Sequence, residues 1–176
     1  ILKALALQIG NEVSYNELAQ LLDSDKETIE KYIDLLEKVY VIFRLPGLNR
    51  NIRNEIKKGR KIYFYDNGIR NAVLGNFLPP DSRSDTGALW ENFMISERLK
   101  IISNNDEVPM TYFWRTTQQQ EIDYIEEIQN KFYAYEFKWR SAKKPFLSKT
   151  FSNAYPVSEF KVITRDNFSD FLNIGI

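Results

Sequence analysis

The chain has 176 residues, of which 43% are hydrophobic and 14% aromatic, enough to bury a core in one domain or in two small ones. Its 24 basic and 24 acidic residues cancel, so binding to nucleic acid would have to rest on a local basic patch. Cysteine and histidine are both absent, which excludes disulfides, thiolate ligands, histidine bases and typical zinc sites. Any metal should therefore be an oxygen-liganded ion such as Mg²⁺ or Mn²⁺.

No apolar run approaches the ~20 residues that cross a bilayer, and no basic-then-apolar leader is present. We therefore expect neither membrane insertion nor secretion, and the lack of cysteine is compatible with the cytoplasmic location that we predict. The chain begins at Ile1, inside an expected helix, which indicates a piece of a longer protein. The sequence leaves assembly into homo-oligomers open.

Residues 1–80 read as a helical unit followed by a basic hairpin. Apolar spacing predicts helices at 1–9, 15–22 and 25–38, and strands at 39–45 and 61–65. Ser14 and Ser24 are each followed three residues later by glutamate, the capping-box pattern of a helix start. Three helices and a hairpin in this order resemble a winged helix.

The charges of this unit suggest that its hairpin, rather than its third helix, would contact nucleic acid. The third helix is mainly acidic, a poor match to phosphates. The basic residues that we assign to nucleic-acid binding in and around the hairpin are Arg44, Arg50, Arg53, Lys57, Lys58 and Arg60. The alternative is that the helices form a packing unit and the basic loop is merely solvated.

A polar, turn-like stretch near 81–86 predicts the boundary to a second unit, residues 81–176. In this unit we expect a helix from 87 to about 102, strands at 110–115, 121–125, 133–139 and 160–164, a weak helix at 145–154 and a last helical turn at 167–172. The order is helix, strand, strand, strand, helix, strand, so the predicted fold class is α+β or α/β with a mixed sheet.

The hairpin at 121–139 carries the residues with the clearest chemistry. Glu136 and Lys138 lie on one face of the second strand, because side chains alternate, while the aromatic residues between them face the expected core. Asp123 on the partner strand can add a second carboxylate, and Glu91 on the preceding helix a third. Two carboxylates can hold Mg²⁺ against a phosphate, and a lysine beside them can orient a water or stabilise developing charge.

Each of these assignments has a structural alternative. Glu136 and Lys138 could form a salt bridge, worth ~0–1 kcal/mol if exposed. Arg115 could contact phosphate or pair with a nearby carboxylate, and the three tryptophans could stack on bases, although their spacing favours the core. Glu97 would replace Glu91 if Glu91 faced outward.

The second unit resembles the PD-(D/E)xK, restriction-endonuclease-like core shared with Holliday-junction resolvases, on Glu91, Asp123 and Glu136-x-Lys138. More closely, nearly the whole chain is similar to the C-terminal region of prokaryotic AAA+ ATPase-like proteins. The segments that carry this similarity are IYFYDNG (62–68), GALWENF (87–93), YFWRT (112–116), EID (121–123) and EFKW (136–139).

The resemblance implies a winged helix, a nuclease-like domain and an ATPase domain upstream in the same polypeptide. No Gly-x-x-x-x-Gly-Lys-Ser/Thr loop occurs in this chain, so ATP is expected only in that upstream domain. Ile122 stands where the named motif has proline. Two functions follow: a Mg²⁺-dependent phosphodiesterase acting on DNA, or a silent nuclease fold that binds nucleic acid or protein for the ATPase.

Overall fold

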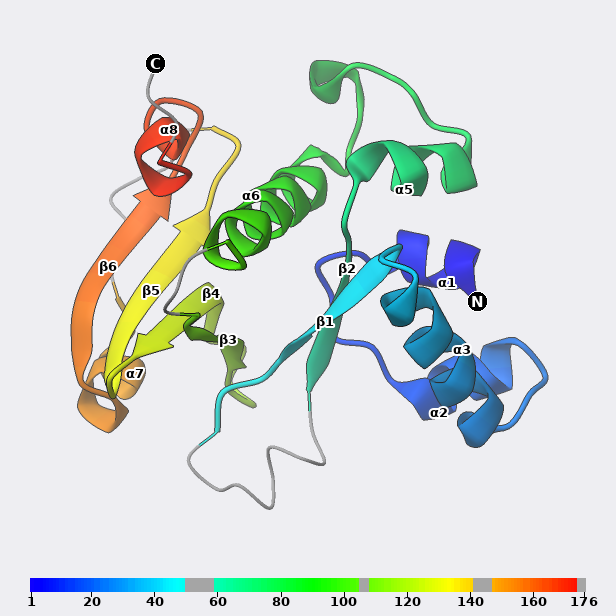
Figure 1. Ribbon diagram of the computed structural model, residues 1–176, viewed down its shortest axis with the longest axis horizontal. Helices are drawn as coiled ribbons and strands as arrows, with labels where there is room; N and C mark the ends of the chain where they lie inside the picture. Colours follow the sequence, from blue (N-terminus) through cyan, green and yellow to red (C-terminus); the bar gives the residue numbers. More distant parts are fainter. Residues whose placement is uncertain (50–58, 105–107, 141–146, 174–176) are drawn as a thin grey trace.

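The computed structural model describes residues 1–49, 59–104, 108–140 and 147–173, which form a mixed α+β fold with two sheets (Figure 1). A two-stranded antiparallel sheet joins β1 and β2, and a four-stranded mixed sheet has the order β3-β4-β5-β6. The elements of the first half are α1 (Leu2–Leu7), α2 (Tyr15–Leu21), α3 (Lys26–Lys38), β1 (Ile42–Pro46), β2 (Arg60–Phe64) and α5 (Asn67–Leu74). Those of the second half are η1 (Pro80–Ser82), α6 (Thr86–Ile102), β3 (Met110–Arg115), β4 (Glu121–Ile128), β5 (Lys131–Phe137), α7 (Lys149–Ala154), β6 (Val157–Ile163) and α8 (Phe168–Phe171).

The three predicted N-terminal helices are confirmed, with one cap corrected. Ser14 accepts a hydrogen bond from the Glu17 amide at 3.3 Å, as the capping pattern predicts. The cap of α3 is Asp25 rather than Ser24, and it accepts from the Thr28 amide at 2.8 Å. A carboxylate one residue further on therefore takes the role that we assigned to the serine.

The hairpin of β1 and β2 is antiparallel, with Ile42 opposite Phe64 and Pro46 opposite Arg60. The strand predicted from residue 39 begins only at Ile42, because Val39 caps α3 and Tyr40 has a left-handed φ of 57°. β2 is buried along most of its length, and this includes the side chain of Lys61, which is 1% exposed.

The four-stranded sheet is built around the β4–β5 hairpin. Its turn is the pair Gln129 and Asn130, both with positive φ, which is the geometry of a two-residue type I′ hairpin loop. A β-bulge lies between β3 and β4, while β5 and β6 run parallel and α7 lies in the connection between them.

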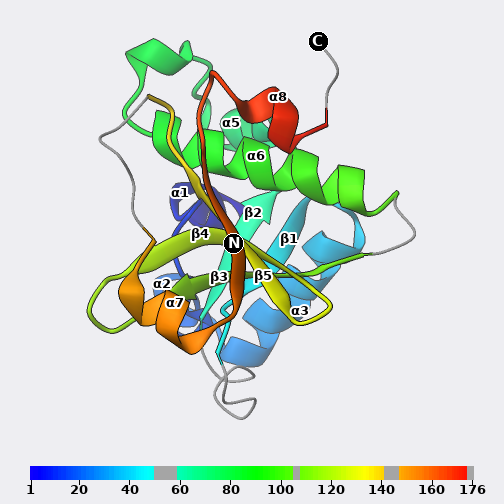
Figure 2. The ribbon, with the colours of Figure 1, turned by 90° about the vertical axis from the view of Figure 1, so that its left-hand side faces the viewer.

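Helices cover both faces of this sheet: α6 lies on one and α7 on the other (Figures 1 and 2). Tyr135 and Phe137 of β5 belong to the main core with α6, whereas Phe132 and Ala134 pack with Phe151 of α7. The strand that we expected to be buried on its aromatic side is therefore buried on both sides in its first half, where Ala134 is fully buried.

The two halves of the chain share one continuous hydrophobic core. Ile33 of α3, Ile62 of β2, Met94 of α6 and Tyr124 of β4 are all members of it. Backbone contacts also join the halves, since the Leu48 amide donates to the carbonyl of Phe113 at 2.7 Å. The division at residue 80 stays a prediction. Within the described ranges, every helix is too short or too polar to cross a bilayer.

Asn92 on α6 connects the second half to the end of β2 through a buried amide. Its Nδ2 donates to the Phe64 carbonyl and to Asn67 Oδ1, each at 2.9 Å, and its Oδ1 accepts from the Phe64 amide at 2.8 Å. The side chain has no exposed surface. Asn92 therefore pairs with both backbone groups of Phe64. Its Nδ2 and Oδ1 cannot change places, because each faces a group of the opposite hydrogen-bonding type.

We expect Asn92→Asp to lower the free energy of unfolding by at least about 2 kcal/mol, because two buried acceptors lose their donor at ~1–3 kcal/mol each. Urea denaturation measures the loss. Asn71→Asp is the matched control, since Asn71 only accepts from Arg83 in the described contacts and a carboxylate preserves that bond. Equal stability of the two variants would contradict this role of Asn92.

Candidate functional site

Asp123 lies in the β-bulge of β4, where the pairing with β3 skips between Tyr112 and Trp114. The β4–β5 ladder ends at Tyr124 and Tyr135, and beyond it Asp123 Oδ2 accepts from the Phe137 amide at 2.8 Å. The carboxylate thus takes the place of a ladder acceptor. This bond fixes Asp123 beside β5, with its side chain 13% exposed.

Glu136 and Lys138 lie at the end of β5, next to Asp123. Lys138 Nζ is 3.6 Å from Glu136 Oε2 and 4.0 Å from Asp123 Oδ2, and its side chain is 41% exposed. The structure therefore brings Asp123, Glu136 and Lys138 together, as the sequence predicts. The long ion-pair distances and the exposure leave the ammonium free to turn toward a substrate.

Glu91 points from α6 toward β2 rather than outward. Its Oε1 accepts from the Tyr63 hydroxyl at 2.5 Å and from Lys61 Nζ at 3.1 Å. Lys61 also pairs with Glu121 Oε1 at 2.5 Å. We call Glu91, Glu121, Asp123, Glu136, Lys61 and Lys138 the acid–lysine cluster.

Our sequence analysis missed Lys61 and Tyr63 as partners of the site, because both belong to a strand that we assigned to the basic hairpin. One sequence signal was available. Lys61 and Tyr63 alternate within an otherwise apolar strand, so they share a face, and a lysine on such a strand needs a buried acidic partner.

Burial raises the pKa of all three predicted carboxylates. It raises the pKa of Glu91 from its usual 4.5 to about 7, against the opposing effect of Lys61. Burial also raises the pKa of Asp123 and of Glu136, in both cases against Lys138. Burial alone would lower the pKa of Lys61, but Glu91 and Glu121 outweigh it and raise that pKa, so the ammonium stays charged.

Asp123 and Glu136 have suitable donor atoms for a divalent ion, since both offer carboxylate oxygens. Burial disfavours the negative charge of both groups, and Lys138 offsets this effect only in part. Mg²⁺ is commonly held by one or two carboxylates while water and substrate phosphate complete its shell. The predicted third ligand is placed differently. Glu91 is engaged by Lys61 and Tyr63, and among the described residues no three acidic side chains form a metal-binding group.

The predicted nucleic-acid contacts have mixed placements. Arg44 is held by Glu37, through a 2.9 Å bond from Nε, and by Asp34 at 2.8 Å, so its charge is already compensated. Arg115 lies 4.0 Å from both Glu12 and Glu121. Four predicted residues lie outside the described part of the chain: Arg50, Arg53, Lys57 and Lys58.

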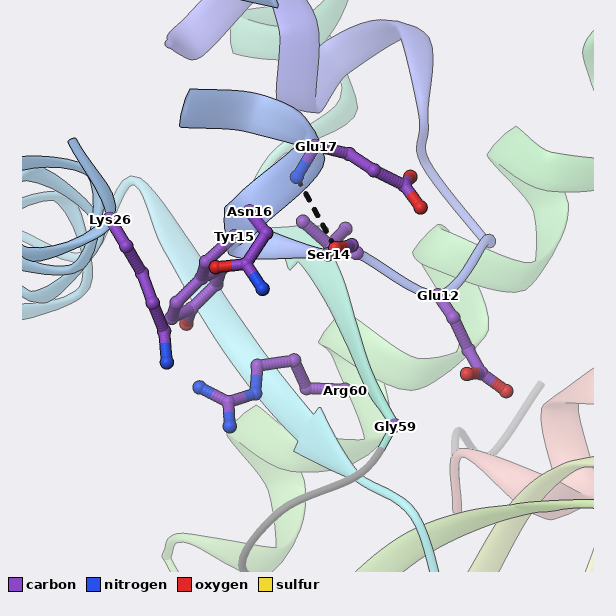
Figure 3. A pocket seen from close by; sticks show the side chains of 9 residues that line it. Glu12, Ser14, Tyr15, Asn16, Glu17, Lys26, Gly59 and Arg60 are labelled. Atoms are coloured by element: carbon purple, nitrogen blue, oxygen red, sulfur yellow. Dashed lines mark hydrogen bonds between the residues drawn. The ribbon is translucent and has the colours of Figure 1, made fainter. Parts of the chain in front are cut away.

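Arg60 faces a hollow of about 430 Å³ beside the start of α2 (Figure 3). Its guanidinium lies 4.5 Å from the centre of the Tyr15 ring, and Lys26 points into the same space from α3. Within the described ranges Arg60 forms no ion pair, so its charge is available to a phosphate. The hollow does not include Asp123 or Glu136.

The remaining alternatives are settled by burial. Trp90 and Trp114 are 8% and 6% exposed, and Trp139 packs against the core with its ring 5.4 Å from that of Trp90. Trp90 and Trp114 are core residues, and Trp139 is a partly buried residue that packs against the core. Glu97 pairs with Lys100 on the surface of α6 and does not substitute for Glu91.

Comparisons with known proteins divide the chain into two matches. Residues 1–79 match a family described as a domain of unknown function (DUF8612), and residues 86–172 match another described in the same words (DUF4143). Uncharacterized proteins of Mycobacterium bovis and Mycobacterium tuberculosis are each 31% identical over 152 residues, or 85% of this chain. The chain spans about a third of the length of these curated relatives.

An uncharacterized protein of Haemophilus influenzae is 28% identical over 76 residues, which is 40% of this chain and 19% of that protein. No solved structure matches the chain. The site's chemistry therefore has to be argued from its own residues.

The raised pKa of Glu91 predicts a pH-dependent stability. Between pH 4.5 and about 7 the folded protein holds a proton that the unfolded chain has released, so the free energy of unfolding falls as pH rises through this window, by up to about 3 kcal/mol. Glu91→Gln should flatten this fall in urea denaturation series, whereas Glu97→Gln should not. A wild-type slope in Glu91→Gln would show that the proton is held elsewhere.

Proposed function

We propose that this chain is the C-terminal region of an AAA+ ATPase-like protein, and that its second half is a PD-(D/E)xK-like domain that cleaves phosphodiesters in DNA with Mg²⁺ or Mn²⁺. The observation that carries the proposal is the meeting of Asp123, Glu136 and Lys138 at the end of the β4–β5 hairpin. Two partly buried carboxylates beside an exposed ammonium suit the binding of a metal ion and a phosphate, because an exposed ion pair at these distances adds little stability.

The topology of the second half supports this fold assignment. The order α6, β3, β4, β5, α7, β6 is that of the nuclease-like core, and only β5 and β6 run parallel among the neighbouring strands. The first half, with three helices and a hairpin, fits a winged helix. The DUF4143 match over 86–172 agrees with the similarity to AAA+ ATPase-like C-terminal regions.

In this proposal each member of the site has a distinct task. When bound to Asp123 and Glu136, the ion supplies polarisation of the scissile phosphate and a lowered pKa of a bound water. Asp123 is fixed for this task by the Phe137 amide. Lys138, whose side chain is 41% exposed, turns toward the substrate and donates to the attacking water or to a phosphate oxygen.

DNA is the proposed substrate because the sequence from 44 to 61, in and around the hairpin, holds seven of the 24 basic residues and only one acidic residue. Among the predicted nucleic-acid contacts, Arg60 and Arg115 are the described residues without a close carboxylate partner, and in the sequence Arg50, Arg53, Lys57 and Lys58 fall between β1 and β2, which begins at Arg60. ATP binding would belong to the upstream domain, which supplies the energy for moving or remodelling the DNA.

The second candidate function is a silent nuclease fold that binds DNA or a protein for the ATPase. One observation favours it: the lysines Lys61 and Lys138 already offset part of the negative charge of the cluster. Salt-sensitive DNA binding that is lost on replacing Arg53, Lys57 and Lys58, without cleavage, would support this candidate. No DNA binding at any salt concentration would point to a protein partner.

The test of the proposal is cleavage of linear and branched DNA in Mg²⁺ or Mn²⁺ by the wild type and by Asp123→Asn. We expect cleavage by the wild type and none above background by the variant. Glu97→Gln is the control, because Glu97 is an acidic residue of the same domain that lies away from the site. Equal cleavage by wild type and Asp123→Asn would overturn the proposal, and so would no cleavage of any substrate.

A further inference from the structure

Lys61 is a buried cation that the first half of the chain delivers to the acid–lysine cluster. Its side chain is 1% exposed, and its Nζ lies 3.1 Å from Glu91 Oε1 and 2.5 Å from Glu121 Oε1. One ammonium therefore joins a carboxylate of α6 to a carboxylate of β4. The nuclease-like chemistry proposed above assigns no task to this residue.

The surroundings of Lys61 hold the ammonium in one position. Its backbone pairs with Glu12, its Nζ lies 5.4 Å from the centre of the Phe113 ring, and Tyr63 donates to the same oxygen of Glu91 at 2.5 Å. The side chain of Lys138 is held less tightly, with ion-pair distances of 3.6 and 4.0 Å and 41% exposure. Lys61 is thus a fixed charge, and Lys138 is an adjustable one.

A fixed ammonium between two carboxylates occupies the position that a second divalent ion would need. Two-metal phosphodiesterases place their ions ~3.5–4 Å apart, so carboxylates on both sides have to be free to bind them. Here Glu91 and Glu121 are already bound by Lys61, whereas among the described ion pairs Asp123 and Glu136 have Lys138 as their cation, at 4.0 and 3.6 Å. Among the described residues, no three acidic side chains form a metal-binding group.

We propose that Lys61 acts as a built-in cation for Glu91 and Glu121, so that the cluster binds one divalent ion, at Asp123 and Glu136, and not two. Glu91 is then a positioning residue that holds Lys61 and β2 against α6, rather than a metal ligand. The expectation of one ion at Asp123 and Glu136 rests on the proposed function. The pairing of Lys61 with Glu91 and Glu121 does not depend on that function, and the experiment below tests the two statements separately.

The experiment counts Mn²⁺ ions bound to the purified chain, with the free ion measured by its electron paramagnetic resonance signal. The wild type is expected to bind one ion. Lys61→Met replaces the ammonium side chain with an uncharged side chain of similar length. Glu91 and Glu121 then have no bound cation, and we expect a second ion to bind to them. Adding Glu121→Gln to Lys61→Met returns the count to one, and Lys61→Arg, which keeps the charge, stays at one.

Lys61→Met leaves two carboxylates without their partner, so two further variants keep the wild-type lysine. Glu91→Gln is expected to bind one ion, like the wild type, whereas Asp123→Asn is expected to bind none. Circular dichroism confirms that each variant is folded. Loss of the ion in Glu91→Gln would make Glu91 a ligand and overturn the inference.

The remaining outcomes are also decisive. Two ions in the wild type, or an unchanged count in folded Lys61→Met, would overturn the built-in cation. The wild type could bind no ion while Lys61→Met binds one that is lost when Glu121→Gln is added. That result would support the role of Lys61 and contradict the metal site of the proposed function. One ion in the wild type and two in Lys61→Met would support both the role of Lys61 and the metal site at Asp123 and Glu136.

Discussion

We expect Lys138→Met to slow DNA cleavage by about 10²–10³-fold, the usual cost of losing one donor to the charge that develops in a transition state. Lys138 Nζ lies within 4.0 Å of both Asp123 and Glu136, so it is the cation closest to a phosphate bound between them. Folding should hardly change. An exposed pair at these distances contributes only ~0–1 kcal/mol to stability.

Three measurements isolate this effect: the single-turnover cleavage rate, Mn²⁺ binding and the urea midpoint. Lys138→Met should change the first strongly and the other two little. Lys161→Met is the matched control, because Lys161 is an exposed lysine of the neighbouring strand that pairs with Glu159 at 2.8 Å. Cleavage by Lys138→Met at the wild-type rate would leave Lys138 with no chemical role.

The largest expected effect on stability comes from Arg98, which joins α6 to β4 and α8. Its Nε and Nη2 donate to the two oxygens of Glu126 at 2.7 and 2.9 Å, and its Nη1 donates to the Phe171 carbonyl at 3.0 Å. The side chain of Glu126 is 2% exposed. Arg98→Met therefore strands a buried carboxylate, and we expect it to lower the free energy of unfolding by about 3–5 kcal/mol.

Urea denaturation of the single and double variants tests this expectation. Arg98→Met combined with Glu126→Met should recover most of the loss, because two apolar side chains can replace a buried ion pair at little cost. Lys100→Met is the control on the same helix, since its partner Glu97 is 34% exposed and the pair contributes little. A loss below 1 kcal/mol for Arg98→Met would mean that water reaches Glu126.

Local patterns in the sequence predict the elements of this fold closely. The strand predicted at 110–115 is β3 with the same bounds. The two strands of the 121–139 hairpin are present, but both extend further toward their turn and the second ends at Phe137. These predictions succeed because alternation and helical spacing depend on near neighbours. The cap of α3 shows the limit: Ser24 and Asp25 are both good caps, and the sequence does not decide between them.

The site was predictable where its residues share one hairpin and not where they come from distant elements. Asp123 and Glu136 each lie next to Tyr124 and Tyr135, the last pair of the β4–β5 ladder, so hairpin pairing brings them together. Lys61 meets Glu91 and Glu121 only because β2 packs against α6 and the β3–β4 edge. The apolar strand around Lys61 indicates that this lysine needs an acidic partner, but no periodicity encodes the packing of distant elements, so neither Glu91 nor Glu121 could be identified as that partner.

The most direct test of the central claim is a crystal of this chain soaked in Mn²⁺ and measured for anomalous scattering. We predict a peak at about 2.0–2.2 Å from carboxylate oxygens of both Asp123 and Glu136, a distance typical of small octahedral ions. Lys61 should still lie between Glu91 and Glu121. A crystal that takes up no Mn²⁺ at this pair under saturating conditions would contradict the claim.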